Sequence, residues 1–281
     1  MGELLMANEA WIRTTFFVGI LLIIMGAEAA FPRRRRDIPR FVRWSSNLAI
    51  VVINALAVRL IFPFVAIGLA VLAQERGWGL FNIVDVPFAF ACIISVLTLD
   101  LVVYLQHVML HAVPAFWRLH RMHHTDLNFD VSTGVRFHPV EILLSMGIKL
   151  AVVAVIGPPA VAVLIFEILL NATSMFNHSN LRIHVAVDRV LRLLVVTPDM
   201  HRVHHSIHPN ETNSNFGFNL PWWDRLLGTY RPQPREGHEG MTIGIEQFRS
   251  PRELTLHRML VQPLRGPASG YPVNRRNKEP E

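Results

Sequence analysis

Residues 100–124, DLVVYLQHVMLHAVPAFWRLHRMHH, decide how this sequence folds. The stretch begins within an apolar run of membrane-helix character and ends among closely spaced histidines. Residues three or four apart share one face of a helix, so His107 and His111 point their imidazoles in one direction. After Pro114, a residue type that suits the first position of a helix, comes a second group at similar spacing: His120, His123 and His124.

A third group with this spacing lies further along the chain and comprises His201, His204 and His205. Thr197 and Pro198 precede it, as a helix cap and a first helical residue would. A single histidine is more often a surface or core residue, but buried imidazoles are costly without partners. Neutral imidazole is also the commonest protein ligand of transition metals. Eight histidines at ligand spacing therefore predict a metal site, and they are too many for one ion.

The composition indicates a membrane protein. Of the 281 residues, 51% are hydrophobic and only 17% are charged, whereas soluble domains carry about 25% charged residues. The net charge of +6 comes almost entirely from arginine. The basic patches interleaved with aromatic residues that nucleic-acid binding needs are absent, so we expect contact with anionic lipid head groups and no nucleic-acid partner. The single cysteine, Cys92, excludes a disulfide framework and a thiolate zinc cluster within the chain.

Four apolar regions predict an all-α, multi-span transmembrane fold. They cover residues 14–31, 47–73, 86–110 and 140–177. The first three approach or exceed the roughly 20 residues that cross a bilayer, although Arg59 and Pro63 interrupt the second. Gly157-Pro158-Pro159 breaks the last region into two short arms, 140–156 and 159–177. These arms form either a tight two-span hairpin or a re-entrant one.

The basic block Arg33-Arg34-Arg35-Arg36 predicts the orientation of the chain. Because such blocks stay on the cytoplasmic side, we interpret residues 14–31 as an uncleaved span with its N-terminus outside. The alternative, a signal peptide cleaved after Ala27-Glu28-Ala29, lacks a basic region before the apolar run. Every histidine group then lies at the cytoplasmic face. The short chain, the bias of arginine over lysine and the lack of an evident retention signal favour a bacterial inner membrane.

Polar side chains form a stripe on each of two predicted membrane helices. With successive spacings of four, three and four, the stripes are Asp100, Tyr104, His107 and His111, and Glu167, Asn171, Ser174 and His178. Polar residues at membrane depth usually face the protein interior and mark function, so we predict His178 as a ninth metal ligand. Asp100 either orients a ligand or pairs with Arg59, and Glu167 either lines a substrate cavity or pairs with Lys149. The residues that we expect around the ligands or a cavity are Asp100, Tyr104, His138, Asn171 and Ser174, with His138 anchoring a turn.

The histidine groups and their surroundings resemble the fatty acid hydroxylase/sterol desaturase superfamily of integral-membrane di-iron enzymes. Its most specific motifs here are FWRLHRMHH at 116–124, RFHPVE at 136–141, FNHSN at 176–180, NFG at 215–217 and WDRLLGTY at 223–230. We take residues 85–232, which carry the resemblance, as a metal-binding domain that follows N-terminal spans at 1–84. A Pro- and Arg-rich cytosolic tail at 233–281 completes the chain, and we expect its last fifteen or so residues to be disordered.

The resemblance implies a helical membrane domain capped by a cytosolic helical site, two iron ions, O2 as co-substrate and a lipid substrate. The metal ligands that it implies are His107, His111, His120, His123, His124, His178, His201, His204 and His205. The family's fatty acid 2-hydroxylases have a further histidine where this chain has Ser174, which leaves the coordination of one metal open. Because no fused cytochrome b5 or ferredoxin domain is evident, we expect a separate electron donor, either a ferredoxin or a cytochrome b5-like protein with its reductase. We also expect that purified protein can carry zinc in place of iron.

The sequence leaves several functions open. Hydroxylation and desaturation of a fatty acyl, sterol, hopanoid or related lipid diverge only at a late step, and no motif separates them. A metal-dependent lipid lyase of the same family is one alternative. A divalent-metal transporter is a weaker one, because transport sites lie near the mid-membrane and these histidines gather at one surface. A b-type haem carrier would need histidines that face each other from two helices.

Overall fold

The computed structural model describes residues 2–268 and 273, and this part of the chain is helical without a strand. The long helices are α1 (Gly2–Ala30), α2 (Arg40–Ile61), α3 (Ala66–Arg76), α5 (Phe88–Ala112), α7 (Pro139–Ile156) and α8 (Ala160–Asn177). The shorter helices are α4 (Leu80–Ile83), α6 (Pro114–His124), α9 (Val185–Leu191), α10 (Pro198–His204), α11 (Pro209–Thr212), α12 (Trp222–Leu226), α13 (Gly237–Gly240) and α14 (Leu256–Val261). Three 3-10 turns are η1 (Thr133–Val135), η2 (Pro251–Leu254) and η3 (Gln262–Leu264).

Five stretches are long and apolar enough to cross a membrane. They are Ala7–Ala30, Arg40–Ile83, and helices α5, α7 and α8. These stretches coincide with the apolar regions predicted from the sequence. The second is interrupted as predicted, since α2 ends at Ile61 and α3 begins at Ala66. Pro63 between them lacks an N–H and disfavours a helical conformation in the residue before it.

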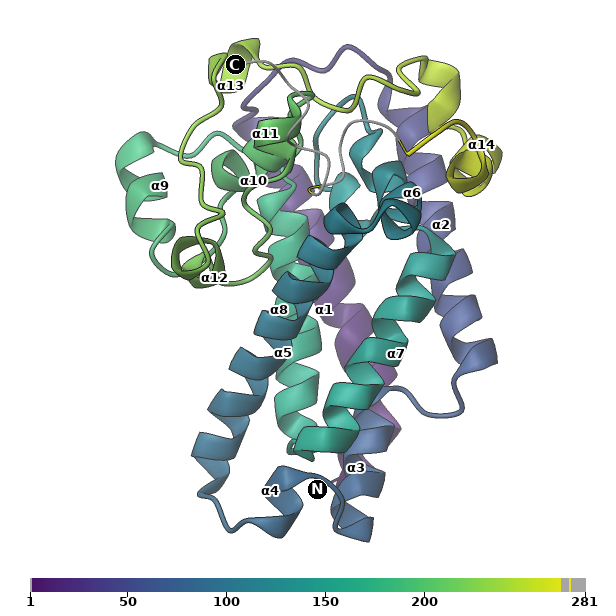
Figure 1. The fold of residues 1–281 in the computed structure, drawn as a ribbon, viewed down its shortest axis with the longest axis vertical. Helices are drawn as coiled ribbons and strands as arrows, with labels where there is room; N and C mark the ends of the chain where they lie inside the picture. The colour runs from purple at the N-terminus through teal and green to yellow at the C-terminus, as the bar shows by residue number, and fades with distance from the viewer. Residues whose placement is uncertain (1, 269–272, 274–281) are drawn as a thin grey trace.

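The long helices stand side by side in a bundle, and the shorter helices α6 and α9 to α14 form a cap at one end (Figure 1). Helix α1 runs toward the cap, α2 and α3 lead away from it, and α5 returns to it. Helices α7 and α8 then go away from the cap and back. The all-α, multi-span fold with a helical cap is therefore confirmed.

The α7–α8 hairpin runs the full length of the bundle. Its tip at Gly157 lies against the loop between α3 and α4, where the Asn82 side-chain amide donates to the carbonyl oxygens of Trp78 (2.6 Å) and Gly157 (3.4 Å). The two backbones are so close that a Cβ on Gly79 would lie 2.3 Å from the Gly157 nitrogen. Both glycines also have a positive φ, 87° and 60°, which favours glycine. The hairpin therefore reaches the end of the bundle opposite the cap, and each of its arms is long and apolar enough to cross a membrane.

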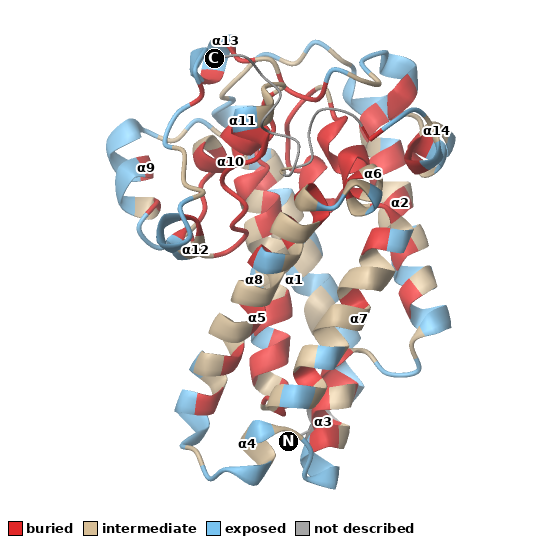
Figure 2. Cartoon of the chain, in the orientation of Figure 1, coloured by how far each residue is buried: buried red, intermediate tan, exposed pale blue. Residues whose placement is uncertain are grey.

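Buried side chains concentrate in two places (Figure 2). Within the bundle, Ile67 of α3, Leu99 of α5, Val153 of α7 and Phe166 of α8 belong to one apolar cluster. The second place is the base of the cap, where α6 and α10 meet the ends of α5 and α8 (Figure 2). Many buried residues there are polar, and buried polar groups need partners. That need makes the base of the cap the place to look for chemistry.

Buried charges hold the cap to the first two helices. Arg43 of α2 is fully buried and forms ion pairs with Asp126 (2.6 Å) and Asp130 (2.7 Å). The Glu28 carboxylate of α1 accepts the backbone N–H groups of Val131 (2.8 Å) and Asn180 (2.7 Å). Removing one partner of such a buried pair leaves an uncompensated charge, which is strongly destabilising. These contacts therefore fix the segment after α6, and the end of α8, relative to α1 and α2.

The arginine block between α1 and α2 lies at the cap end of the bundle. Arg33 pairs with Asp199 (3.3 Å) and Glu239 (2.8 Å), both in the cap. Arg36 pairs with Glu28 (2.8 Å). Part of the basic charge that the sequence analysis assigned to lipid head groups is therefore used within the protein. The block and the histidine groups share one end of the molecule, as the sequence indicated.

Residues 241–268 pack onto the cap. Met259 of α14 forms an apolar cluster with Ile50 and Met122, and Ala268 belongs to another cluster with Trp117. Helix α14 therefore covers α2 and α6. The disorder predicted for the last fifteen or so residues concerns positions that, apart from 267, 268 and 273, lie outside the described residues.

The variant Gly79→Ala should destabilise the protein. The added Cβ would clash with the backbone at Gly157, and alanine would be held at a positive φ, at a combined cost of roughly 2–4 kcal/mol. The unfolding temperature in detergent should fall. The matched control is Gly147→Ala in α7, where no atom lies within 4 Å of the new Cβ, and its unfolding temperature should not fall. Equal unfolding temperatures for the two variants would show that the hairpin tip is not packed as described.

Candidate metal centre

Buried histidines gather at the base of the cap in two groups, and within each group the potential ligand nitrogens lie within 4.8 Å of one another. The first group is His107, His111, His120, His124 and His204. The second group is His123, His178, His201 and His205. Every member is at most 1% exposed. The structure thus brings together all the residues that we predicted as ligands.

The helices that carry the histidines begin where the sequence predicted. Helix α6 has Pro114 at its first position, and α10 has Pro198. The Thr197 hydroxyl caps α10 by accepting the backbone N–H of Met200 (3.4 Å). A proline costs no helical hydrogen bond at a first position, so both helices can start abruptly. Each start sets which face of the helix, and therefore which imidazoles, points inward.

The two groups share helices, and this feature could not be read from the sequence. Helix α6 gives His120 and His124 to the first group but His123 to the second. Helix α10 and its C-cap residue are divided in the same way. The groups are therefore adjacent, and the rings of His124 and His205, one from each group, stack with centroids 4.5 Å apart.

In the second group, neutral imidazoles point unprotonated nitrogens at each other. Burial lowers the pKa of His123 well below its usual value and that of His178 to about 3, so both rings are neutral at physiological pH. Their Nδ1 atoms lie 3.2 Å and 2.7 Å from the carbonyl oxygens of Arg136 and Ser174, respectively, so each Nδ1 carries the ring proton. The two Nε2 lone pairs then face each other across 3.0 Å. That contact is repulsive unless a cation lies beside both.

The first group is arranged in the same way. The Nδ1 of His107 donates to the carbonyl oxygen of Phe216 (2.7 Å), and the Nδ1 of His120 donates to the Glu141 carboxylate (2.7 Å). Their Nε2 atoms are 3.0 Å apart. A carboxylate behind a metal-bound histidine fixes the ring and strengthens it as a ligand. Glu141 stands out in the sequence only as the end of the RFHPVE motif, and its contact with His120 was not predicted.

Other ring nitrogens have no hydrogen-bond partner within the described part of the chain. They include Nε2 of His204 and both nitrogens of His205. Buried polar atoms are nearly always satisfied, so these nitrogens point to ligands that the protein itself does not supply. Together with the facing lone pairs, they fit metal ions. A donor set of imidazole without thiolate suits iron, zinc or copper.

One loop orients three histidines of the first group. Besides Phe216, the loop at residues 213–217 provides the Asn213 side-chain oxygen to Nδ1 of His111 (3.2 Å) and the Ser214 carbonyl oxygen to Nδ1 of His204 (2.7 Å). Such outer contacts set the tautomer and the direction of each ring. The sequence offered only a faint signal, the NFG motif at 215–217.

Asp224 of α12 holds that loop in place. Its fully buried carboxylate accepts the backbone N–H groups of Phe216 (2.8 Å) and Gly217 (2.9 Å) and the Thr229 hydroxyl (2.7 Å). Asn215, within the loop, has a left-handed φ of 52°. Its side-chain amide donates to the carbonyl oxygens of Met200 and Arg231, each at 2.8 Å. Strain of this kind persists only where the surroundings over-determine it.

Tyr104 and Asp100, two of the residues expected near the ligands, contact the segment around Asp224 that holds this loop. The Tyr104 hydroxyl lies 2.9 Å from the Thr229 hydroxyl, next to Asp224. The Asp100 carboxylate accepts the Trp223 indole N–H (2.8 Å) and the Leu220 backbone N–H (3.3 Å). Within the described part of the chain, its hydrogen-bond partners include neither a histidine of the two groups nor Arg59, which were its two predicted alternatives. Both residues thus act on the ligands through the segment 216–229.

The next two expected residues have structural contacts. His138 caps α7 by accepting the Val140 N–H at Nδ1 (3.2 Å), and its Nε2 lies 3.1 Å from the Leu260 carbonyl oxygen. It therefore anchors the turn, as we expected. The Ser174 hydroxyl donates to the Gly134 carbonyl oxygen (2.7 Å). Its side chain is occupied there, and Ser174 reaches the second group through its carbonyl oxygen.

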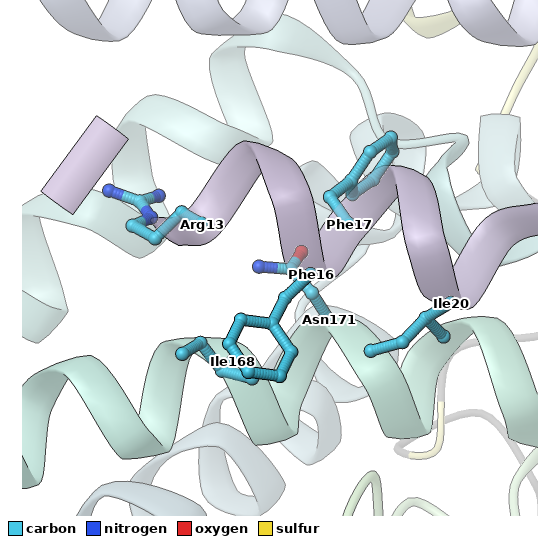
Figure 3. Close-up of a pocket in the computed structure, with 6 residues that line it drawn as sticks. All are labelled: Arg13, Phe16, Phe17, Ile20, Ile168 and Asn171. Atoms are coloured by element: carbon cyan, nitrogen blue, oxygen red, sulfur yellow. The ribbon is translucent and has the colours of Figure 1, made fainter. Parts of the chain in front are cut away.

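Asn171 lies away from the ligands. It is seven residues before His178 on α8, about 10 Å at the rise of an α-helix, and donates to the carbonyl oxygen of Glu167 (2.8 Å). Figure 3 shows it in a small pocket between α1 and α8, beside Arg13 and Phe16. Glu167 pairs with Lys149 (2.8 Å) and Arg13 (3.3 Å). The ion pair with Lys149 was one of the two alternatives predicted for Glu167.

The fold and the site define a helical membrane protein with a buried histidine centre suited to metal. Residues 92–229 match the fatty acid hydroxylase family. The chain is 30% identical over 149 residues to the ornithine lipid hydroxylase OlsE of Rhizobium tropici, a match that covers 53% of this chain and 44% of the relative. It is 28% identical over 176 residues to the alkylglycerol monooxygenase of Danio rerio, covering 61% and 38%. The corresponding human enzyme is 27% identical over 188 residues, covering 66% and 40%.

The matched segment, residues 92–229, therefore belongs to the fatty acid hydroxylase family. The chain spans less than half of the length of these curated relatives. No solved structure gives a significant match. The resemblance found in the sequence is confirmed at the level of the family.

The variants His204→Ala and His123→Ala, one from each group, should each lose close to one metal ion per chain. Each removes a nitrogen from a different set, and the remaining histidines keep the other set intact. Metal content is measured by mass spectrometry on protein purified in mild detergent. His257→Ala is the control, because His257 is exposed and outside both groups. Full metal content in either group variant would contradict the ligand assignment.

The variant Asp224→Ala should act through folding. It leaves the N–H groups of Phe216 and Gly217 buried without an acceptor, at a cost of about 1–3 kcal/mol each. Unfolding temperature and metal content should fall together, because the loop behind His107 loosens. Asp224→Asn keeps a side-chain oxygen and should lose less of both. A stable Asp224→Ala protein with full metal content and no activity would show that the carboxylate takes part in the reaction itself.

Proposed function

We propose that this chain is a membrane-bound oxygenase that binds two iron ions and uses O2 and external electrons to hydroxylate or desaturate a lipid. The ligands in this proposal are His107, His111, His120, His124 and His204 for one ion, and His123, His178, His201 and His205 for the other. The proposal rests on one observation: in each of two adjacent groups, a pair of histidines turns unprotonated Nε2 atoms toward each other at 3.0 Å.

The choice of iron and of oxygen rests on the donor set and on the relatives. A structural zinc site is typically a closed set of four ligands, whereas the first group offers five histidines. The relatives named above are hydroxylases and monooxygenases of lipids. An iron pair, when bound, would supply the oxidant that breaks an unactivated C–H bond.

The protein's own part in this reaction is to hold the metals and to keep water away from them. Neutral imidazoles bind a cation without cancelling its charge, which keeps it electrophilic. Aromatic side chains wall the site: the Phe137 ring stacks on His123 (centroids 4.6 Å apart), and Trp117 lies 4.8 Å from His111. Phe218 lies 5.0 Å from His107. An apolar wall of this kind suits a hydrocarbon chain and disfavours water.

We further propose that the cap faces the cytoplasm of a bacterial cell, at the inner membrane. The support is the arginine block at the cap end of the bundle, because basic residues near spans stay inside. A lipid would then enter the site from the bilayer. A separate ferredoxin or cytochrome b5-like protein with its reductase would supply electrons from the cytoplasm.

The deciding experiment is a metal count with Mössbauer spectroscopy on one sample, purified in mild detergent from iron-supplemented cells. We expect about two irons per chain, as in other two-metal sites, with an antiferromagnetically coupled signal. Lipids from expressing cells should then contain species that have gained one oxygen atom or lost two hydrogen atoms. One metal or none, or zinc that iron cannot replace, would overturn the oxygenase and point to a lyase or to metal transport.

A further inference from the structure

Helix α9 and the residues that follow it bury a charged pair and expose most of their apolar side chains. Asp188 and Arg192 are buried and paired with each other, Nε to Oδ2, at 2.6 Å. The apolar side chains point outward, and each of Val185, Val187, Val190, Leu193 and Leu194 is more than half exposed. A surface helix in water places its charges outside and its apolar stripe on the core. This segment does the reverse.

Helix α12 has the same inversion and is joined to the residues that follow α9. Asp224 is fully buried, while Leu226 is 74% exposed and Leu227 54%. The Trp222 indole N–H donates to the Leu193 carbonyl oxygen (2.7 Å), which joins the two segments. We call the exposed apolar side chains of residues 185–194 and 222–227 the apolar edge. Exposed apolar surface of this extent marks a contact surface on a soluble or a membrane protein.

Side-chain hydrogen bonds attach the apolar edge to α5 and α8 at positions within the spans, before their cap-side ends. The α12 indole of Trp223 is bonded to Asp100, which is twelve residues, or about 18 Å, before the end of α5. Asn219, just before α12, bonds Thr173, which is four residues, or about 6 Å, before the end of α8. Figure 1 shows α9 and α12 outside the bundle, beside the cap-side halves of α5 and α8.

The charges around the apolar edge are of one sign. In residues 181–194 and 219–230, the acidic side chains are Asp188 and Asp224, and both are buried. The exposed charged side chains of the same segments are Arg182, Arg189 and Arg225. Basic residues beside an apolar face, with a tryptophan at the boundary, are typical of segments that lie in the head-group region of an anionic membrane.

We propose that the apolar edge lies in the lipid leaflet on the cap side, with its aliphatic side chains among the acyl chains and its arginines at the phosphates. The surface continues the lipid-facing sides of α5 and α8, so the same bilayer covers both. The Asp188–Arg192 pair then faces the protein because the outside is lipid. Asp224, on the buried side of α12, also supports the loop behind His107, so this membrane contact and the metal centre share one helix.

The test uses single cysteines in a Cys92→Ala background, since Cys92 is the chain's one cysteine. Leu194→Cys and Leu226→Cys are labelled with an environment-sensitive fluorophore, and Glu239→Cys, exposed on α13, is the matched control. The proteins are placed in nanodiscs of phosphatidylethanolamine and phosphatidylglycerol. Quenching by a nitroxide on the lipid chain is compared with quenching by aqueous iodide. None of these positions binds metal, so the readout does not depend on catalytic activity.

Labels at 194 and 226 should emit at shorter wavelength than the label at 239 and should be quenched several-fold more by the lipid nitroxide than by iodide. The label at 239 should show the opposite preference. Equal iodide quenching at all three positions would overturn the proposal. Self-quenching that grows with the number of chains per disc would overturn it too, because a second copy would then cover the apolar edge. Circular dichroism and unfolding temperature confirm that each labelled protein is folded.

Discussion

The structure depends on holding buried, neutral imidazoles so that their unprotonated Nε2 atoms face one another, although the lone pairs on these atoms repel. Each of the four histidines that face a neighbour across 3.0 Å is held by an acceptor behind its Nδ1, and these acceptors come from α7, α8 and the loops at 136 and 216. Without them the rings would turn to form ordinary hydrogen bonds with each other. Much of the cap, including the Asp224 contacts and the Arg43 pairs, serves to hold these acceptors in place.

Local sequence was enough to predict the helices and to find the nine histidines that the structure gathers. Helical spacing places imidazoles on one face, and a proline at a first helical position fixes where that face begins. Both rules act within a few residues, so they identified the faces of α6 and α10 and the position of His178 at the end of α8. The spans were equally accessible, because hydrophobic length is a local property.

What the sequence did not yield depends on contacts between distant segments. His123 and His124 are neighbours, yet they belong to different groups, and only the packing of α6 against α10 decides this. The acceptors at 213–217 lie far along the chain from His107 and His111. The close approach of Gly79 to Gly157, which packs the hairpin tip against the loop after α3, also joins distant segments. The inversion of α9 was hidden because buried Asp188 and Arg192 look like ordinary surface charges in a sequence.

The order of synthesis gives the loop at 213–217 a further consequence. A ribosome makes all nine histidines before it makes this loop and Asp224, and domains fold as units while they emerge. The second group has its acceptors, the carbonyls of Arg136 and Ser174, upstream of its last ligand. The first group must wait for residues 213–229 to emerge. The contacts that orient His107, His111 and His204 are therefore the last part of the centre to be synthesised.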